Sequence, residues 1–279
     1  MYNARIITDA GKEFQFGYEY GTIFDISPLS GNDITLGTSQ GFQQIGVTVE
    51  NQSIGGIYRT IRGTILNKQT AKKMLSFLPA FTTGRLFVNN SRFCEIVINK
   101  TPELLFLKNG KITFSMRVFC ASPYWSNSAS NSFTISSFKK AFSFPVIYDS
   151  HRFAIQSETA FINCYNNGDV ASPLICEFTS DTDVTNYGVI NVRTLQELRF
   201  DDTLHSGEKT KVFYENGRIK ATKEDENGNV MGFLGYLSDS SNLFNILPGD
   251  NIIKATAETN EKYLRALVSF RPAFMGVVL

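Results

Sequence analysis

One short pattern in the sequence is typical of a nucleophilic serine. Residues 37–41 (GTSQG) match G-x-S-x-G, in which the glycines permit a strained strand-to-helix turn that exposes the serine, here Ser39. The residues after Gly41 instead predict another strand, and the chain lacks the alternating strands and helices of that hydrolase fold. His205, one of 2 histidines, is the available partner for Ser39. A serine hydrolase is therefore the weakest function that we consider.

Metal and acid–base patterns are incomplete. Asp225, Asn227 and Asn229 occupy the first three ligand positions of an EF-hand-like loop. Val230 and Tyr236 then stand where that loop requires a glycine and a bidentate glutamate, so a turn closed by Asx side chains is favoured. Neither a phosphate-binding loop nor a dinucleotide-binding glycine pattern is present. We predict no catalytic, cofactor-binding or metal-binding residues and a protein that is not an enzyme.

The composition narrows the class of protein further. The 279 residues carry 27 Lys+Arg against 26 Asp+Glu, with 24 Phe and 11 Tyr. Low charge with many aromatic residues favours half-buried strands and argues against disorder and charge-driven nucleic-acid binding. No signal-peptide segment and no apolar run of about 20 residues is present, so we expect a soluble protein made in the cytoplasm, with no membrane partner. The 4 cysteines form no C-x-x-C pair, which predicts buried, reduced thiols at Cys94, Cys120, Cys164 and Cys176.

One helix is predicted. Asn67 is a suitable N-cap, and an apolar stripe at helical spacing follows it, made of Ala71, Met74, Leu75 and Leu78. Pro79 ends the helix because proline removes a donor and clashes with the preceding turn.

Alternating apolar residues predict strands over most of the remaining chain. The clearest hairpin joins residues 104–108 to 111–120 through Asn109-Gly110, a dipeptide typical of a two-residue type I′ turn. Beyond a small polar stretch at 126–132, short strands alternate with turn residues such as Asn216-Gly217, which is typical of an antiparallel sandwich. We therefore predict a mainly β protein with two domains, 1–127 and 128–279.

Six short segments follow one another in a characteristic order along nearly the whole chain. They are 27–31 (SPLSG), 38–46 (TSQGFQQIG), 58–65 (YRTIRGTI), 84–88 (GRLFV), 119–125 (FCASPYW) and 244–253 (FNILPGDNII). The fifth contains a PYW signature and the sixth an LxPGxN turn. In this order and spacing, they resemble the distal tail protein family of long-tailed phages and tail-derived particles, the Dit-like component of siphophage tails.

The resemblance implies both a fold and an assembly. The fold is a tail-tube-like N-terminal β-sandwich or split barrel with one α-helix, followed by a galectin-like antiparallel β-sandwich. The family assembles as a hexameric ring at the virion tail tip, where it joins the tail tube protein to the tail-associated hub protein. The ring is also a platform for receptor-binding and baseplate proteins, and DNA only passes through its lumen. Unpaired edge strands invite pairing between copies, and six head-to-tail contacts satisfy them without growing into a fibre.

The residues singled out for function are contact residues. The candidate loop that contacts an adjoining ring or the tube consists of Ser39, Gln40, Phe42 and Gln44, with an ordinary solvated loop as the alternative. The residues predicted to pack the domain junction are Pro123, Tyr124 and Trp125. A structural turn is predicted at Pro248, Gly249, Asp250 and Asn251, where proline presets one φ and glycine tolerates a positive φ.

A carbohydrate-binding adhesin is the alternative function. It would act through the C-terminal sandwich, because antiparallel sandwiches often bind sugars and sugar rings stack on exposed aromatic side chains. The available platforms in that domain are Tyr165, Tyr187, Tyr214 and Tyr236, although a strand tyrosine more often packs half-buried.

Overall fold

Strand pairing divides the chain into two compact units. The computed structural model describes residues 2–31, 34–136, 138–140, 154–156, 161–215 and 218–278. The N-terminal unit comprises Met1–Ala129 and Ala273–Leu279, and the C-terminal unit comprises Ser130–Pro272. The first division lies close to the predicted boundary after residue 127. The end of the chain, however, belongs to the N-terminal unit, whereas the sequence assigned all of 128–279 to the second domain.

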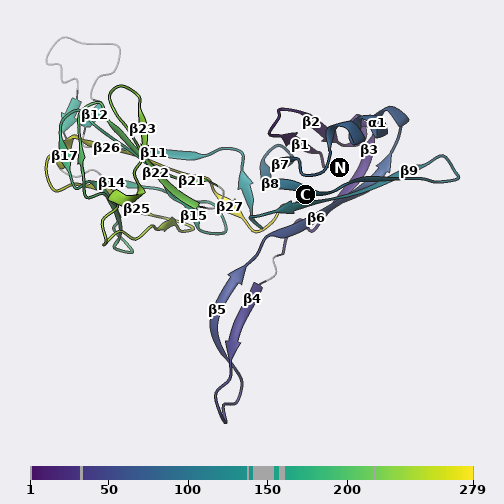
Figure 1. Cartoon of the computed structure of the whole chain (residues 1–279), viewed down its shortest axis with the longest axis horizontal. Coiled ribbons are helices and arrows are strands. Elements are labelled where there is room, and N and C mark those ends of the chain that lie inside the picture. Colours follow the sequence, from purple (N-terminus) through teal and green to yellow (C-terminus); the bar gives the residue numbers. More distant parts are fainter. Residues whose placement is uncertain are drawn as a thin grey trace. The chain divides into compact units, whose positions relative to one another are not determined.

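An antiparallel sheet of nine strands builds the N-terminal unit (Figure 1). Its main path runs in the order β2-β1-β7-β8-β9-β6-β3; off this path, β10 pairs with β8, and β27 pairs with β10. The strands are β1 (Ala4–Thr8), β2 (Glu13–Phe16), β3 (Thr22–Ser27), β6 (Ile57–Ile65), β7 (Thr83–Val88), β8 (Arg92–Phe106), β9 (Ile112–Cys120), β10 (Trp125–Asn127) and β27 (Ala273–Phe274).

The two edge strands of this path, β2 and β3, meet at one end of the sheet. The backbone N–H of Thr22 donates to the carbonyl of Gly17 at 3.0 Å, and the Gly17 N–H donates to Thr22 Oγ1 at 2.8 Å. Phe16 and Phe24 pack against each other beside this contact, with ring centroids 5.5 Å apart. The Gly17–Thr22 hydrogen bonds therefore close the turn that leads from β2 into β3, and the two rings pack beside that turn.

The predicted helix is confirmed as α1 (Lys68–Phe77), the only α-helix among the described residues. The Asn67 side chain accepts a hydrogen bond from the Thr70 N–H at 2.7 Å, which is the predicted N-cap. The buried residues of the stripe are Ala71, Met74 and Leu78. The prediction for Leu75 is wrong, since its side chain is 52% exposed and only the narrower stripe faces the sheet. None of the described helices has the length and apolar character to span a bilayer.

The hairpin between β8 and β9 differs from the prediction in its turn. Gly110 has a φ of +77°, but Asn109 has no positive φ, so the type I′ prediction is wrong. The Gly110 N–H instead donates to the Leu107 carbonyl at 2.9 Å, and the loop has three residues with glycine at the left-handed position. Alternate residues of β9 form a buried face, made of Ile112, Phe114, Met116, Val118 and Cys120.

The return of the chain end to the N-terminal unit has a clear cause in pairing. In β27, Phe274 lies opposite Trp125 of β10. The N–H of Val277 then donates to the carbonyl of Leu29 at 3.2 Å. Backbone hydrogen bonds between strands do not depend on which side chains are present. The amino-acid sequence therefore gives no sign that the last residues pair with the N-terminal unit.

Two antiparallel sheets form the C-terminal unit. The larger sheet runs β11-β26-β16-β21-β22-β23 and consists of β11 (Asn131–Ser136), β16 (Ile175–Ser180), β21 (Lys209–Glu215), β22 (Arg218–Glu224), β23 (Val230–Gly232) and β26 (Leu264–Phe270). The smaller sheet runs β14-β25-β18-β19 and consists of β14 (Phe161–Asn163), β18 (Gly188–Asn191), β19 (Gln196–Arg199) and β25 (Ile252–Thr256). Short pairs complete the unit: β12 (Phe138–Lys140) with β13 (Ala154–Gln156), β15 (Ser172–Pro173) with β24 (Asn245–Ile246), and β17 (Val184–Thr185) with β20 (Thr203–Leu204).

The core of the C-terminal unit lies between its two sheets. Phe178 and Val268 of the larger sheet and Val189 and Ile253 of the smaller one are buried in a single cluster. The predicted antiparallel sandwich and the mainly β class are therefore confirmed. The predicted Asn216-Gly217 turn lies outside the described residues.

Candidate functional site

A separate hairpin of the N-terminal unit contains the predicted contact loop. It consists of β4 (Ile34–Ser39) and β5 (Thr48–Ile54), which pair only with each other among the described strands (Figure 1). None of the residues from 34 to 54 is buried. This hairpin thus has no core of its own beneath it.

One face of the hairpin is apolar. Residues directly opposite each other in an antiparallel pair share a face, and Ile34 lies opposite Ile54 while Leu36 lies opposite Gln52. A β-bulge at Gly37/Thr38 then brings Val49 opposite Thr38, on that same face. The apolar face comprises Ile34, Leu36, Val49 and Ile54, which are 57%, 52%, 53% and 43% exposed. A two-stranded hairpin is marginally stable alone in water, so a face of this kind calls for a covering partner.

The tip of the hairpin is a turn organised by Gln44. The Gln44 N–H donates to the carbonyl of Gly41 at 3.1 Å, and Gln43 has a φ of +61°. The Gln44 side chain accepts from the Gly41 N–H at 2.8 Å and donates to Thr48 Oγ1 at 2.9 Å. Two apolar side chains project from this ordered tip: Phe42 is 96% exposed and Ile45 is fully exposed.

The predicted contact residues therefore lie together at the tip, although their surroundings differ from the prediction. Ser39 ends β4 and is not in the loop, and the Gln40 amide donates to the Gln44 carbonyl at 3.2 Å. Gln44 is engaged within the tip, which leaves Phe42 as the predicted residue that is free for a contact. The sequence analysis missed the apolar face, for which alternation at 34 and 36 is the available signal.

The geometry around Ser39 differs from that of a nucleophile elbow. The chain runs strand–turn–strand here, and Ser39 is exposed on β4. A Cβ at Gly37 would lie 2.1 Å from the Asn51 side-chain oxygen across the hairpin, so a larger residue there requires the exposed Asn51 side chain to move. His205 belongs to the C-terminal unit, where its Nδ1 lies 3.0 Å from an Asp183 carboxylate oxygen.

The residues predicted to pack the domain junction surround a buried cation in the N-terminal unit. Trp125 is fully buried and donates its indole N–H to the Leu29 carbonyl at 2.9 Å. The Arg59 guanidinium, also fully buried, lies 4.4 Å from the centre of a Trp125 ring. It donates to the Pro123 carbonyl at 2.8 Å and to the Pro28 carbonyl. Tyr124 is only partly buried.

Two thiols lie beside this cation. Cys94 and Cys120 are buried with their sulfur atoms 3.5 Å apart. The hydrogen bond with Cys94 and the nearby Arg59 charge outweigh burial and lower the pKa of Cys120, whereas burial raises the pKa of Cys94. In the C-terminal unit, burial alone raises the pKa of Cys164 to about 12. All four cysteines are free and buried, as predicted.

The turn at Pro248, Gly249, Asp250 and Asn251 is tied to a neighbouring segment of the C-terminal unit. Gly249 has a φ of +87° and exchanges backbone hydrogen bonds of 2.8 and 2.9 Å with Asn166. The buried Asn251 side chain donates to the Leu247 carbonyl at 2.7 Å and accepts from the Leu247 N–H at 3.0 Å. These contacts satisfy the buried amide within the chain, and the assignment of the turn as structural remains a prediction.

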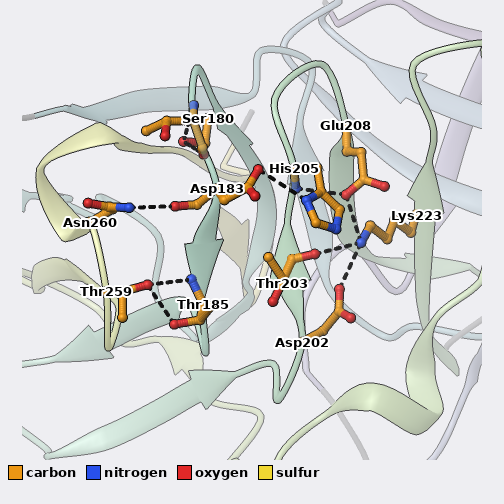
Figure 2. Close-up of polar contacts among 11 residues, drawn as sticks. Ser180, Asp183, Thr185, Asp202, Thr203, His205, Glu208, Lys223, Thr259 and Asn260 are labelled. Carbon is orange, nitrogen blue, oxygen red and sulfur yellow. Dashed lines mark hydrogen bonds and ion pairs between the residues drawn. The ribbon is translucent and has the colours of Figure 1, made fainter.

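Figure 2 shows the densest polar network of the C-terminal unit, centred on Lys223. Its ammonium lies 2.8 Å from carboxylate oxygens of Asp202 and Glu208 and donates to the Thr203 carbonyl at 2.9 Å. Burial disfavours the charged forms of both Lys223 and Glu208. The two carboxylates nevertheless raise the pKa of Lys223, and hydrogen bonds from Lys223 and the His205 N–H lower the pKa of Glu208. One ammonium therefore faces two carboxylates, and its removal would leave them without a counter-charge, so we interpret the network as a structural element.

The loop at residues 225–229, whose sequence partly matches an EF-hand, is closed by hydrogen bonds among its own residues. The Asp225 carboxylate accepts from the backbone N–H groups of Asn227 and Asn229 at 2.9 and 2.8 Å and from the Asn229 amide at 2.8 Å. These bonds lower the pKa of Asp225 and form the predicted Asx turn. Within the described part of the chain, no group of three His, Cys, Asp or Glu residues is arranged to hold a metal ion.

The tyrosines considered as sugar platforms have different environments. Tyr187 is fully buried, and its hydroxyl hydrogen-bonds to Thr210 Oγ1 at 2.5 Å, so it is excluded as a platform. Tyr236 stacks on Phe233 with ring centroids 4.4 Å apart. Tyr165 is 56% exposed, and Tyr214 is partly buried. Of the four candidates, Tyr165 and Tyr236, which is 46% exposed, therefore leave the most ring surface open to solvent.

Comparison with known proteins identifies a shared fold. Neither a protein-family model nor a curated protein matches the sequence. The Dit protein (gp 19.1) of phage SPP1, described as a paradigm of the hub adsorption apparatus in phages that infect Gram-positive bacteria, is similar in structure. The TM-score is 0.68 at 11% sequence identity, over 98% of this chain and 99% of that chain.

Two chains from phage P2 baseplate structures in the activated conformation are also similar. The chain from the baseplate with Ca has a TM-score of 0.49 at 10% identity, over 97% of each chain. The chain from the baseplate with Sr has a TM-score of 0.46 at 9% identity, over 96% of this chain and 98% of that chain. The predicted resemblance to Dit-like proteins is thus confirmed for the fold over the full length of the chain.

Proposed function

We propose that this protein is a structural component of a phage tail tip and acts by assembly, not by catalysis. Copies of the chain close into a hexameric ring at the tip of the virion tail. The ring joins the tail tube protein to the tail-associated hub protein, and host-adsorption or baseplate proteins attach to it. The full-length likeness in fold to the SPP1 hub protein is the observation that carries this proposal.

The hairpin of β4 and β5 provides a physical reason for copies of the chain to associate into a ring. Its apolar face is uncovered within one chain, and both of its outer strand edges are unpaired among the described strands. A second copy covers the face and pairs the edges, and the same contact repeated around a symmetry axis covers every hairpin at once. Phe42 and Ile45 at the tip extend this contact toward the neighbouring copy or the adjoining ring.

The test is the mass of the particle in solution. Size-exclusion chromatography with light scattering is expected to find a species near six times the chain mass of 31.2 kDa, alone or after mixing with a hub protein. Electron micrographs of that species are expected to show rings. The double variant Leu36→Ser/Ile54→Ser removes apolar contact area and shifts the population to monomers.

A matched control separates assembly from folding. Thr35→Ala/Ser53→Ala changes an opposed pair on the other face of the same two strands and should leave the oligomer intact. Trp125, the only tryptophan, reports whether each variant keeps the N-terminal core. A chain that stays monomeric under all these conditions contradicts the proposal, and an oligomer indifferent to Leu36→Ser/Ile54→Ser contradicts the role of the hairpin.

A further inference from the structure

A surface hollow of about 500 Å³ lies in the N-terminal unit between β2, α1 and the short 3₁₀ helix η1 (Tyr18–Tyr20). Its volume is within the range of roughly 300–1,000 Å³ that is usual for small-molecule sites. The side chains that matter for its chemistry are Gln15, Tyr18, Glu19, Tyr20, Gln69 and Lys73. None of them belongs to the β4–β5 hairpin or to the cluster formed by Arg59 with Pro28, Pro123 and Trp125, which we call the Arg59 cluster.

Two aromatic rings form one side of the hollow. Tyr18 is 64% exposed and Tyr20 is 42% exposed, although both are large and amphipathic. Their backbone is held in place: the Tyr20 carbonyl accepts from the Thr70 hydroxyl of α1 at 3.3 Å, and the Gly21 N–H donates to the Tyr18 carbonyl at 3.0 Å. The rings are therefore presented on a braced turn, at low conformational cost to a ligand that stacks on them.

Some of the polar groups around the rings are engaged: the Gln15 amide donates to Glu13 at 2.8 Å, and the Lys73 ammonium lies 5.5 Å from the centre of the Phe77 ring. The side chains of Glu19 and Gln69 have no hydrogen-bond partner, and Lys73 has no ion-pair partner, within the described residues. Together they offer a carboxylate acceptor, an amide that both donates and accepts, and an ammonium donor.

The charged side chains that line the hollow, Glu19 and Lys73, indicate which class of ligand fits it. One carboxylate and one ammonium give no net charge, so a phosphate or another anion meets an acceptor that repels it. A neutral ring with many hydroxyls and one apolar face matches both the exposed aromatic faces and the mixed donors and acceptors.

We propose that this hollow is a binding site for a neutral carbohydrate, such as a short oligosaccharide of a bacterial surface. The sugar ring stacks on Tyr18 or Tyr20, and its hydroxyls bond to Glu19, Gln69 and Lys73. This site lies in the N-terminal unit and differs from the C-terminal sandwich considered as an adhesin. It goes beyond the structural role proposed above and does not depend on it.

Calorimetric titration of the full chain with maltotriose, cellotriose and triacetylchitotriose tests the site, with inorganic phosphate as the anionic comparison. At least one trisaccharide is expected to bind with a Kd on the order of millimolar, and phosphate is expected not to compete. Tyr18→Ala and Tyr20→Ala should together weaken binding by about tenfold, which corresponds to the loss of one aromatic stacking contact. Tyr58→Ala removes a tyrosine that is 50% exposed elsewhere in the unit and should leave the affinity unchanged.

Three results would overturn the proposal: no binding of any of the three trisaccharides, equal affinity in the Tyr18→Ala/Tyr20→Ala variant, or displacement of the sugar by phosphate. Trp125 fluorescence during unfolding confirms that the variant retains its core. Particle mass measured on the same samples separates the two proposals, because a failure of sugar binding leaves the ring intact and a failure of the ring leaves sugar binding intact.

Discussion

The two units each bury one cationic side chain among the described residues, and they compensate its charge in different ways. Arg59 of the N-terminal unit is held by two backbone carbonyls and the face of Trp125, with no carboxylate within ion-pair distance in the described structure. Lys223 of the C-terminal unit lies against the carboxylates of Asp202 and Glu208. A planar guanidinium suits several fixed acceptors and a ring, whereas a compact ammonium suits carboxylates.

The two buried cations differ in how far their contacts depend on pH. Carbonyl oxygens and an indole ring do not titrate, so these contacts of Arg59 persist over the physiological range. The titratable groups beside Arg59 are the thiols of Cys94 and Cys120, and the pKa of Cys120 is lowered by its hydrogen bond with Cys94 and by the Arg59 charge. Glu208 beside Lys223 has a lowered pKa, so the stability of the C-terminal unit is linked to the protonation of this carboxylate.

The largest expected effect is on the Arg59 cluster. Arg59→Ala leaves the buried carbonyl of Pro123 without its donor, at about 1–3 kcal/mol, removes a donor from the partly buried carbonyl of Pro28 and opens a cavity beside Trp125. We expect the free energy of unfolding of the N-terminal unit to fall by about 3–5 kcal/mol, measured by denaturant titration of Trp125 fluorescence. Arg62→Ala on the same strand is the control, because Arg62 is 67% exposed and pairs only loosely with Asp25. Comparable losses in both variants would contradict the special role of Arg59.

A smaller loss is expected from Lys223→Met. The change leaves two partly buried carboxylates facing each other without a cation, which we expect to cost about 2–4 kcal/mol in the C-terminal unit. Hydrogen exchange of β21 and β22 measures this loss separately from the N-terminal unit. Lys220→Met on the same strand removes an exposed ion pair with Glu215 and should change stability by less than about 1 kcal/mol. Equal protection in Lys223→Met and wild type would show that the network contributes nothing.

The smallest effect concerns pH. Because the pKa of Glu208 is lowered in the folded state, its stabilising contribution is present above the ordinary carboxyl pKa and is lost as pH falls through the folded value. The raised pKa of Lys223 gives a contribution that is present below the ordinary lysine pKa and is lost as pH rises through the folded value. We expect protection of the C-terminal unit to be flat near neutrality and to fall in acid. Lys223→Met should flatten that acid slope, and an unchanged slope would contradict the linkage.

Much of the fold follows from local patterns. The N-cap at Asn67, the buried alternation from Ile112 to Cys120 and the short strands of the C-terminal unit are each specified by residues close together in the sequence. The Asn109-Gly110 turn was mispredicted because one dipeptide fits two loop lengths, and the choice depends on the register of the whole hairpin. Leu75 was mispredicted because spacing alone does not show which residues of a helix stripe are covered, and only Ala71, Met74 and Leu78 of this stripe are buried.

The candidate site was predictable only in part. Ser39, Gln40, Phe42 and Gln44 do gather at one hairpin tip, since they are neighbours in the chain. Whether an apolar side chain is covered depends on what packs against it, and the alternation of Ile34 and Leu36 resembles that of any strand with a core.

By itself, the sequence determined the class of the protein: strands, one helix, reduced thiols and the local turns, because backbone preferences and apolar periodicity act over a few residues. Only the tertiary structure decided that Phe274 pairs beside Trp125, that Arg59 is buried against carbonyls, and that the apolar face of one hairpin is left uncovered. These features depend on contacts between residues far apart in the chain. Their free energy comes from removing apolar surface from water, set against the entropy of ordering the chain, and neither quantity can be read from a short stretch of sequence.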